Sequence, residues 1–419
     1  MIICLWAYTP LRPPGEKPLF YPQLVKKFYE RNEQRNFWFR ETGDAKALRA
    51  ELIDCVDSCS FYDLVAQPYH YKQIKEYADS APVNATALEE MEKIYTDAAL
   101  ACLKDVYQGY KMFPWVEFDP ISAGRSDTDD EFVLSSLSRA HSVKELHDLF
   151  DFLQPARSEY DSLKHELRVQ KGTGDKNKIR QLTLSMNYFR WIHHFHFSKA
   201  IVVNICSAYL KYWENDSLIM SMKAVLGTPS TPTPTFDAWC PQLILYPYWY
   251  VPRKIALNEY VPRFRNNPAL VDALNMQVID DNGKIINHRK LNWSLFSRTY
   301  FPYNLRQSTG CDNALGVVKF DLASPLGVYL HDTNNKTSFL SGWRYYSHGC
   351  IRIEEPIELA NHLLSNKLDT AFLQACFKDQ KPIPVLLDAP VPVFVIYAPA
   401  EVGNSGNIQY CKDIYRLLK

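Results

Sequence analysis

The chain has 419 residues, and at about 150 residues per domain this length predicts two or three domains. Hydrophobic residues make up 47% and charged residues 22%, so the chain can bury cores and is not expected to be disordered. Its 47 basic and 47 acidic residues give a formal net charge of zero. Because there is no basic excess to neutralise phosphates, nucleic acid is not expected as the main partner.

Membrane and metal signals are weak throughout the sequence. The longest apolar stretches, residues 200–210 and 391–398, fall short of the roughly 18 residues of a membrane span and are predicted to be buried strands. Residues 1–8 are apolar but lack the basic start and cleavage site of a signal peptide. The ten cysteines include no CxxC pair and no Cys/His cluster at zinc spacing, so no metal is expected, and disulfides are neither predicted nor excluded.

The first half of the chain has the apolar period of helices. Leu48, Leu52 and Val56 recur at every fourth position, and residues 88–102 keep a period near 3.6. Cys55 and Cys59 lie one helical turn apart and are expected to pack in a core rather than bind a metal.

Local signals subdivide this helical half. Capping boxes at Thr86 and Ser142 predict two helix starts, because each has a carboxylate three residues later. The acidic stretch 126–131 predicts a solvated loop, and the polar stretch 171–178 predicts a turn before a last helix. With no catalytic constellation found here, residues 1–187 are predicted to form a helical scaffold domain.

From about Lys199 the pattern changes to strands. Runs at 200–206, 209–213 and 218–226, with a turn at Asn215–Ser217, predict hairpins. We also expect an extended proline-rich loop at 228–235, strands at 243–246, 317–320, 327–330 and 393–397, and a helix at 356–366. Residues 256–306 lack strand alternation and are predicted to cover the sheet. The predicted fold class is α+β and multidomain, with a β-rich, β-sandwich-like domain over 188–419 that carries the capping insertion 256–306.

Two short segments hold the residue types of nucleophilic catalysis. Gly349 lets the backbone turn tightly beside Cys350, so that amide groups there can stabilise an oxyanion. A histidine can accept the thiol proton, and His331 ends a predicted strand 19 positions before the cysteine. Arg352 adds a fixed cation that could hold a carboxylate or anchor the loop. Taken alone, a single cysteine or histidine is more often a packed core residue.

The whole pattern resembles the L,D-transpeptidase catalytic domain of the YkuD type. That family has a strand ending in His-[Gly/Asp]-Thr and then Ser-[His/Ser]-Gly-Cys-[Ile/Val]-Arg fewer than twenty residues later, matched here by 331–333 and 347–352. The resemblance extends to the large Gram-negative periplasmic branch, which has an N-terminal helical scaffold domain. It is carried by Gly227 with 232–235, by 246–252, by 313–316 with 318–320, and by Arg190-Trp191.

Two departures from that branch concern regions outside the chemical motif. The peptidoglycan-binding helical module that usually precedes the catalytic domain is expected to be absent, since 163–178 runs almost directly into the last helix. Residues 308–312 replace the prolines that often precede the Asn-Ala-Leu-Gly segment, so the shape of that loop is open.

The resemblance implies catalytic roles for four residues. Cys350 matches the nucleophile and His331 the base, whose ring is oriented by the backbone carbonyl of Asp332, so the Asp332 side chain is not assumed to be a triad acid. Backbone amides around Gly349 and Cys350 would form the oxyanion hole.

Five further residues are expected to shape the substrate site. Ser347 and Arg352 would hold the loop, and His348 would shape the pocket. Tyr329 and Tyr346, the latter together with its neighbour Tyr345, would line the groove, and a core position for Tyr329 is equally compatible with the sequence.

The implied activity is formation of 3→3 cross-links in peptidoglycan through a thioester on Cys350, with a tetrapeptide donor and the amine of a diamino acid as acceptor. Alternatives are an L,D-carboxypeptidase or endopeptidase, in which water resolves the thioester, and a non-catalytic peptidoglycan-binding scaffold. Sequence cannot separate transfer from hydrolysis, because the choice depends on how residues 256–306 cover the acceptor side. Carbapenems are expected to acylate Cys350.

No metal or organic cofactor is expected for this chemistry. The expected partners are peptidoglycan stem peptides, without a membrane span. The cell-wall synthesis machinery is a candidate partner of the helical half, although nothing in its sequence names one. A periplasmic or exported location is inferred from the function.

Overall fold

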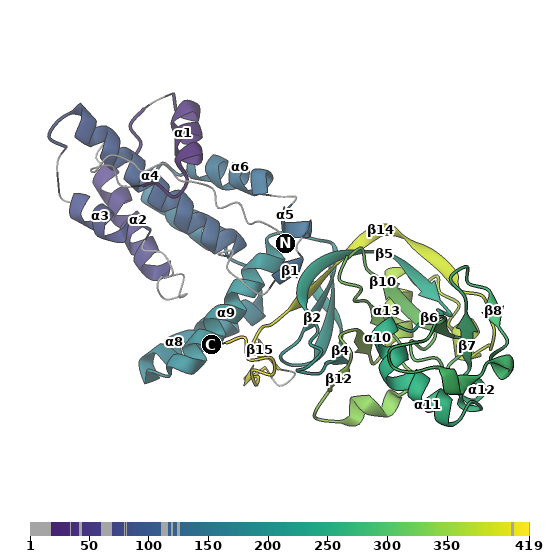
Figure 1. Cartoon of the computed structure of the whole chain (residues 1–419). Helices are drawn as coiled ribbons and strands as arrows, with labels where there is room; N and C mark the ends of the chain where they lie inside the picture. Colours follow the sequence, from purple (N-terminus) through teal and green to yellow (C-terminus); the bar gives the residue numbers. More distant parts are fainter. Residues whose placement is uncertain are drawn as a thin grey trace. The chain divides into compact units, whose positions relative to one another are not determined.

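The computed structural model describes residues 18–33, 35–41, 44–59, 69–78, 80, 82–109, 116–118, 120–123, 126–403 and 406–418. Residues 1–8, which we expect to lack a signal peptide, lie outside this part. The chain divides into two compact units, one made of residues 1–111 and 126–194 and the other of residues 112–125 and 195–419 (Figure 1). The boundary predicted at 187/188 falls within the last helix of the first unit.

The first unit is helical, as predicted. Its helices are α1 (Pro22–Arg31), α2 (Ala45–Cys59), α3 (Tyr71–Tyr77), α4 (Ala85–Gln108), α6 (Ser126–Leu137), α7 (Val143–Phe152), α8 (Ser158–Thr173) and α9 (Lys176–His193). The long α4 contacts α1, α2, α3, α6 and α9. Its small residues Ala98, Ala99 and Ala101 are fully or nearly fully buried, which lets neighbouring helices approach closely.

Buried acidic side chains of α4 hold the loops around it. The Glu92 carboxylate, 3% exposed, accepts the backbone N–H groups of Phe37, Trp38 and Phe39 at 2.7–3.1 Å. A buried carboxylate without such donors would be strongly destabilising, so the loop and the helix stabilise each other.

Two local expectations in this unit are wrong. The helix predicted to start at Thr86 starts earlier, because the Asn84 side chain accepts the N–H of Ala87. Residues 126–131 belong to α6 rather than to a solvated loop. There the buried Asp129 lies 3.4 Å from His194, and Asp130 forms an ion pair with Lys104.

Other local expectations are confirmed. Ser142 and Glu145 form the predicted capping box of α7. The turn expected within 171–178 lies at Gly174, whose left-handed backbone (φ +76°) ends α8 one residue before the Asp175 cap of α9.

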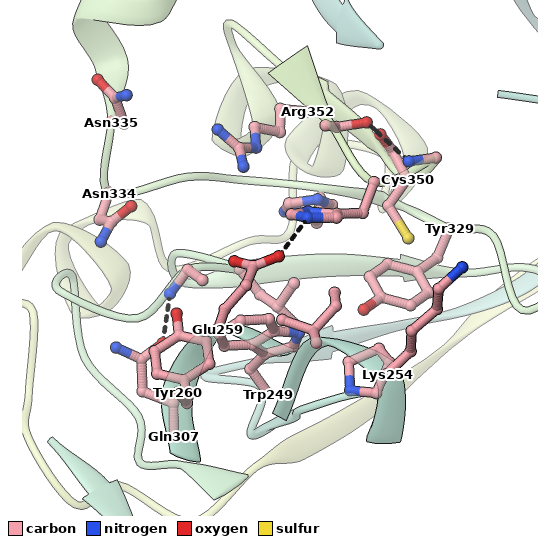
Figure 2. Close-up of a pocket in the computed structure, with 18 of the residues that line it drawn as sticks. Trp249, Lys254, Glu259, Tyr260, Gln307, Tyr329, Asn334, Asn335, Cys350 and Arg352 are labelled. Carbon is pink, nitrogen blue, oxygen red and sulfur yellow. Dashed lines mark hydrogen bonds and ion pairs between the residues drawn. The ribbon is translucent and has the colours of Figure 1, made fainter. Parts of the chain in front are cut away.

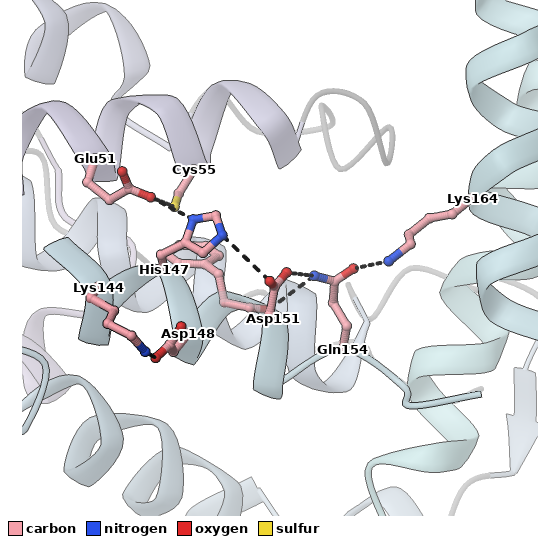
Figure 3. A network of polar contacts seen from close by, with 9 residues as sticks. Glu51, Cys55, Lys144, His147, Asp148, Asp151, Gln154 and Lys164 are labelled. Carbon is pink, nitrogen blue, oxygen red and sulfur yellow. Dashed lines mark hydrogen bonds and ion pairs between the residues drawn. The ribbon is translucent and has the colours of Figure 1, made fainter. Parts of the chain in front are cut away.

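A polar network joins α2 to α7 (Figure 3). The His147 ring lies 2.9 Å from a carboxylate oxygen of Glu51 and 3.6 Å from Asp151. The thiol of Cys55 donates to Glu51, and burial and this carboxylate raise the pKa of the thiol. Cys55 and Cys59 are both buried in the helical core, as expected.

The second unit is β-rich, as predicted. Its main strands are β1 (Val116–Phe118), β2 (Lys199–Asn204), β3 (Tyr209–Glu214), β4 (Ser217–Gly227), β5 (Thr235–Leu245), β10 (Val318–Asp321), β11 (Leu330–His331), β12 (Tyr345–Ser347), β13 (Ile351–Ile353) and β14 (Ile383–Ile396). They form one sheet in the order β5-β10-β11-β13-β4-β3-β2-β14, and β14 pairs back with β5, which closes the sheet on itself. β1 and β12 are added beside β5 and β4 (Figure 1).

Turn chemistry explains where several of these strands begin and end. Asn215 and Asp216 have positive φ angles of 45° and 65°, which is the backbone of a tight two-residue hairpin, so the predicted β3–β4 turn is confirmed. The prediction of a strand at 327–330 is wrong for residues 327–329. The ladder begins only at Leu330, because Gly327 (φ +66°) leaves the extended conformation.

Smaller elements complete the unit. They are α5 (Pro120–Ala123), η5 (Lys336–Leu340), α13 (Pro356–Leu363), α14 (Thr370–Gln374) and the pair β15 (Ala400–Val402) and β16 (Ile408–Tyr410). α13 confirms the helix expected at about 356–366, except that it ends at Leu363. Among the described residues, no helix combines the length and the apolar character needed to cross a membrane.

Residues 256–306 lack strand alternation, as noted in the sequence, but this capping insertion and the residues flanking it form a small sheet of their own. β6 (Trp249–Tyr250), β7 (Met276–Ile279), β8 (Ile285–Ile286) and β9 (Asn304–Gln307) pair in the order β6-β9-β7-β8. The helical turns are α10 (Arg253–Ile255), η2 (Ala256–Tyr260), α11 (Val261–Asn266), α12 (Leu270–Ala273), η3 (His288–Lys290) and η4 (Trp293–Leu295). Phe264, Trp293 and Phe301 form its separate apolar core. Strands of two to four residues are too short to show alternation.

A disulfide joins Cys311 to Cys376, 65 residues apart. It attaches the loop around residues 308–316 to the segment just after α14. The sequence left the shape of this loop and the pairing of the cysteines open.

We expect the double variant Cys311→Ser/Cys376→Ser to lose about 4 kcal/mol of free energy of unfolding, because the bond closes a long loop and restricts the unfolded chain. Denaturant unfolding of the variant and of wild type, each with and without dithiothreitol, measures this. Reductant should destabilise wild type and leave the variant unchanged. Equal stability of variant and oxidised wild type would contradict the prediction.

Candidate active site

Strand pairing brings the two motif segments together. β11 and β13 are parallel, with His331 opposite Arg352, and the Ile351 N–H donates to the Tyr329 carbonyl oxygen at 3.1 Å. Alternate residues of a strand share a face. Tyr329 and His331 therefore face the same side of the sheet as Cys350 and Arg352.

That face forms the floor of a pocket of about 980 Å³ (Figure 2). One side of the pocket is built by the strand ends and the loop before β13. The other is built by the capping insertion and the segment just before it, through residues that include Trp249, Lys254, Glu259, Tyr260 and Arg263.

His331 is buried, 4% exposed, and held in one orientation. Its Nδ1 contacts the backbone carbonyl oxygen of Asp332, as the resemblance implies. A carbonyl oxygen can only accept, so Nδ1 carries the proton and Nε2 keeps its lone pair. Burial, with smaller effects of the charges of Arg352 and Lys319, lowers the pKa of His331 to about 3. The ring is therefore neutral at physiological pH.

The Asp332 carboxylate forms its hydrogen bonds with groups other than His331. One oxygen accepts the Val317 N–H at 2.9 Å, and the other accepts the Thr333 N–H and the Lys336 ammonium, each at 2.6 Å. The side chain thus fixes the loop whose backbone carbonyl orients the imidazole. Gly316 packs against it, and a Cβ at this position would lie only 2.2 Å from the carboxylate.

Cys350 is partly buried, and its Sγ lies 3.9 Å from the Gly327 carbonyl oxygen. Burial raises the pKa of the thiol above its ordinary value, while hydrogen bonding from Tyr329 and the charges of Lys319 and Arg352 oppose this shift. The resting site is therefore a neutral thiol near a neutral imidazole.

The loop before β13 is held by its own hydrogen bonds. Ser347 Oγ donates to the Cys350 carbonyl oxygen at 2.6 Å and accepts the Gly349 N–H at 3.1 Å. Thr233 donates to the Gly349 carbonyl oxygen at 2.9 Å. Gly349 has a φ of +117°, a conformation that side chains disfavour. Within the described residues, the N–H of Cys350 has no acceptor.

The remaining predicted residues have different positions. Tyr329 lines the pocket, with its ring 5.6 Å from that of His331. Tyr346 does not line it, because its hydroxyl contacts Ser341 at 2.7 Å. Tyr345 is buried and donates to backbone carbonyls of the residues just after β2. The expectation that Tyr345 and Tyr346 line the groove is therefore wrong.

Charged residues of the pocket include several that sequence reasoning missed. His348 lies 2.8 Å from Glu259 of the insertion. The Arg352 guanidinium lines the pocket, and its buried Nε has no acceptor within the described residues. Lys254 and Arg263 also line it. No local signal marks Glu259, Lys254 or Arg263, because each reaches the site only through the fold of the insertion or of the segment just before it.

No metal site accompanies this pocket. Across the part of the chain that the structure describes, no group of three or more His, Cys, Asp and Glu side chains is arranged to hold a metal ion.

Comparison with known families finds two matches in this chain. Residues 198–391 match the YkuD family, described as the L,D-transpeptidase catalytic domain, and residues 23–167 match the family described as the scaffold domain. The chain is 30% identical over 284 residues to a provisionally named L,D-transpeptidase of Haemophilus influenzae. This match covers 67% of the chain and 57% of the relative, so the chain spans little more than half of that protein.

Solved structures with some similarity include L,D-transpeptidases from Mycobacterium smegmatis and Mycobacterium tuberculosis. They are 14% and 12% identical, with TM-scores of 0.23 each. Both matches cover 48% of this chain, and 58% and 61% of those chains. Similarity at this level is too low to carry an inference.

Gly316→Ala should destabilise the loop that carries Asp332, because the added methyl group would collide with the Asp332 carboxylate. The backbone φ of +57° at this position also disfavours a side chain. We expect a lower melting temperature, by several degrees, and slower modification of Cys350. Differential scanning fluorimetry and iodoacetamide kinetics measure these, with Gly342→Ala as control, since a Cβ there meets no neighbouring atom. Unchanged stability in Gly316→Ala would contradict the prediction.

The pH dependence of Cys350 alkylation should follow its raised pKa. Because the thiolate forms only above the ordinary thiol range, the iodoacetamide rate of wild type should still be rising at about pH 9. Arg352→Gln removes a cation that lowers this pKa, so its rate at pH 8 should be lower still. Mass spectrometry of the Cys350 peptide gives the rates, with Cys350→Ser as background. A plateau below pH 8 in wild type would be inconsistent with the neutral thiol.

Proposed function

We propose that this chain is a cysteine-dependent L,D-transpeptidase of peptidoglycan, because residues 198–391 match the YkuD family of L,D-transpeptidase catalytic domains and residues 23–167 match the scaffold domain family. The observation that carries the proposal is the placement of Cys350 and the oriented, neutral His331 on one sheet face inside a single pocket. A pocket that only bound stem peptides would not need this pair.

In the first half-reaction, His331 Nε2 takes the proton of the Cys350 thiol as Sγ attacks the carbonyl carbon of the third stem residue, a diamino acid. The C–S bond forms, and the C–N bond to the terminal D-alanine breaks. The departing amine takes the proton back from His331. A neutral imidazole is the form this step requires, which agrees with the lowered pKa of His331.

In the second half-reaction, the neutral amine of a neighbouring stem attacks the thioester. The N–C bond forms as the C–S bond breaks, and His331 passes the proton of the amine to Sγ, which restores the thiol. The product is a 3→3 cross-link. With water as the attacking group, the same steps would release a tripeptide.

We assign the oxyanion contact to the Cys350 N–H. The Gly349 N–H is bonded to Ser347 Oγ, whereas the Cys350 N–H has no acceptor within the described residues. An amide so placed can stabilise the negative charge that develops on the attacked carbonyl oxygen. Gly349 then acts through its backbone conformation.

The charges of the pocket suit an anionic donor. Lys254, Arg263 and Arg352 line it, and a stem peptide carries carboxylates, among them that of its terminal D-alanine. The buried Nε of Arg352 meets no acceptor among the residues that the structure describes, so we propose that this side chain holds a donor carboxylate. Peptidoglycan lies outside the cytoplasm. An exported, periplasmic location therefore follows from the proposal, and the Cys311–Cys376 disulfide supports it, because such bonds persist in oxidising compartments.

Cys350→Ala should abolish turnover of purified tetrapeptide muropeptides, and His331→Gln should lower the rate about 10²- to 10⁴-fold. Mass spectrometry of the products measures both, and a carbapenem should add its mass to wild type but not to Cys350→Ala. Cross-linked dimers from wild type support transpeptidation, and tripeptides without dimers would assign the enzyme to hydrolysis. Unchanged substrate and no acylation would contradict the enzyme proposal and favour the alternative of a non-catalytic peptidoglycan-binding scaffold.

A further inference from the structure

A single carboxylate of the capping insertion is tied to the loop that carries the nucleophile. Glu259 lies in η2 and lines the pocket, and its Oε1 is 2.8 Å from Nε2 of His348 (Figure 2). His348 is two residues before Cys350, and Glu259 and Cys350 line the same pocket. The Glu259 side chain is 47% exposed and therefore open to a ligand.

The contact with His348 leaves Glu259 free to bind a second group. A carboxylate can only accept, so Nε2 of His348 carries the proton that Oε1 receives. Within the described residues, no donor contacts the other carboxylate oxygen of Glu259, and no lysine or arginine pairs with it. One oxygen thus anchors the side chain while the other remains available to a cation.

The pocket has no equivalent second carboxylate. Asp312 also lines it but lies 4.0 Å from the Lys378 ammonium. The other formal charges of the lining are those of Lys254, Arg263 and Arg352, which repel a cation. Among the lining residues, Glu259 is therefore the acidic side chain that an entering ammonium would contact without displacing a lysine.

We infer that Glu259 binds the ammonium of the acceptor stem and so favours the amine over water in resolving the thioester. This inference rests on the proposed function. An amine with a pKa near that of lysine, about 10.4, arrives as a cation at neutral pH. The Glu259 carboxylate holds the ammonium beside the thioester. The ammonium then loses a proton to water, and the resulting neutral amine attacks the thioester. Because water is always present at high concentration, transfer depends on this local enrichment of the amine.

Glu259→Gln keeps an oxygen that can accept from His348 but removes the negative charge. We expect about a fivefold rise in KM for the acceptor amine and a similar fall in the ratio of cross-linked dimer to tripeptide, as for the loss of one partly exposed ion pair. Glu259→Asp retains the charge and should recover most of the ratio. Mass spectrometry of products from purified tetrapeptides, over a range of acceptor concentrations, gives both quantities.

Asp272 provides a matched control in the same insertion. It too is an acidic residue in contact with a histidine, 3.2 Å from His288, but it lies outside the pocket lining. Asp272→Asn should leave the dimer to tripeptide ratio at the wild-type value. A fall in this variant equal to that in Glu259→Gln would show a general effect on the insertion and would overturn the inference.

Formation of the thioester is measured separately, by intact mass in a single turnover without acceptor. If wild type forms no thioester, the proposed function itself fails. If wild type forms thioester and dimers, and Glu259→Gln has the same acceptor KM and product ratio, the inference alone is overturned. It is also overturned if Glu259→Gln slows thioester formation as much as dimer formation, because Glu259 then only anchors the loop. Thioester and tripeptide without dimer in wild type would overturn the assigned selectivity.

Discussion

The candidate site depends on the parallel pairing of two very short strands, β11 and β13. Side chains alternate along a strand, so a shift of either strand by one residue would turn its pocket residues to the opposite face of the sheet. Two or three residues cannot fix such a register alone. The neighbouring strands β10 and β4 hold it from either side, and Glu354, just after β13, also accepts from the backbone and the ammonium of Lys223.

Burial dominates the electrostatics of this site. Two cations, Lys319 and Arg352, act on both the thiol and the imidazole, and alone they would favour a thiolate. The low dielectric of the site opposes charge on either group and outweighs them at Cys350, whose pKa is raised. The site therefore differs from cysteine sites that hold a preformed thiolate–imidazolium pair, and the proposed attack would include transfer of the thiol proton.

The sequence predicted those parts of the fold and site that depend on neighbours along the chain. The Asn215–Ser217 turn, the capping box at Ser142 and the two motif segments around His331 and Cys350 are of this kind. The acidic run 126–131 is typical of a loop, but Asp127 and Asp129 lie in the first turn of α6, where acidic residues stabilise a helix.

Contacts between residues far apart in the sequence could not be predicted from local patterns. Glu259 comes within 2.8 Å of His348 across 89 residues, and the short strands of the insertion pair only because their partners are brought to them. Tyr346 directly precedes the pocket residue Ser347, but its hydroxyl contacts Ser341 instead. The backbone contact of His331 with Asp332 was expected from the resemblance, whereas the bonds of the Asp332 carboxylate to Val317 and Lys336 could be read only from the structure.

The raised pKa of Cys350 has a consequence for the survival of the enzyme. An environment that forms the Cys311–Cys376 disulfide also oxidises free thiols, and it does so through their thiolates. Because burial raises the pKa of Cys350 and keeps the thiol protonated, peroxide and small disulfides meet a poor nucleophile. Burial thus also protects this sulfur from sulfenic acid formation, in a protein that holds Cys311 and Cys376 as a disulfide and Cys350 as a free thiol.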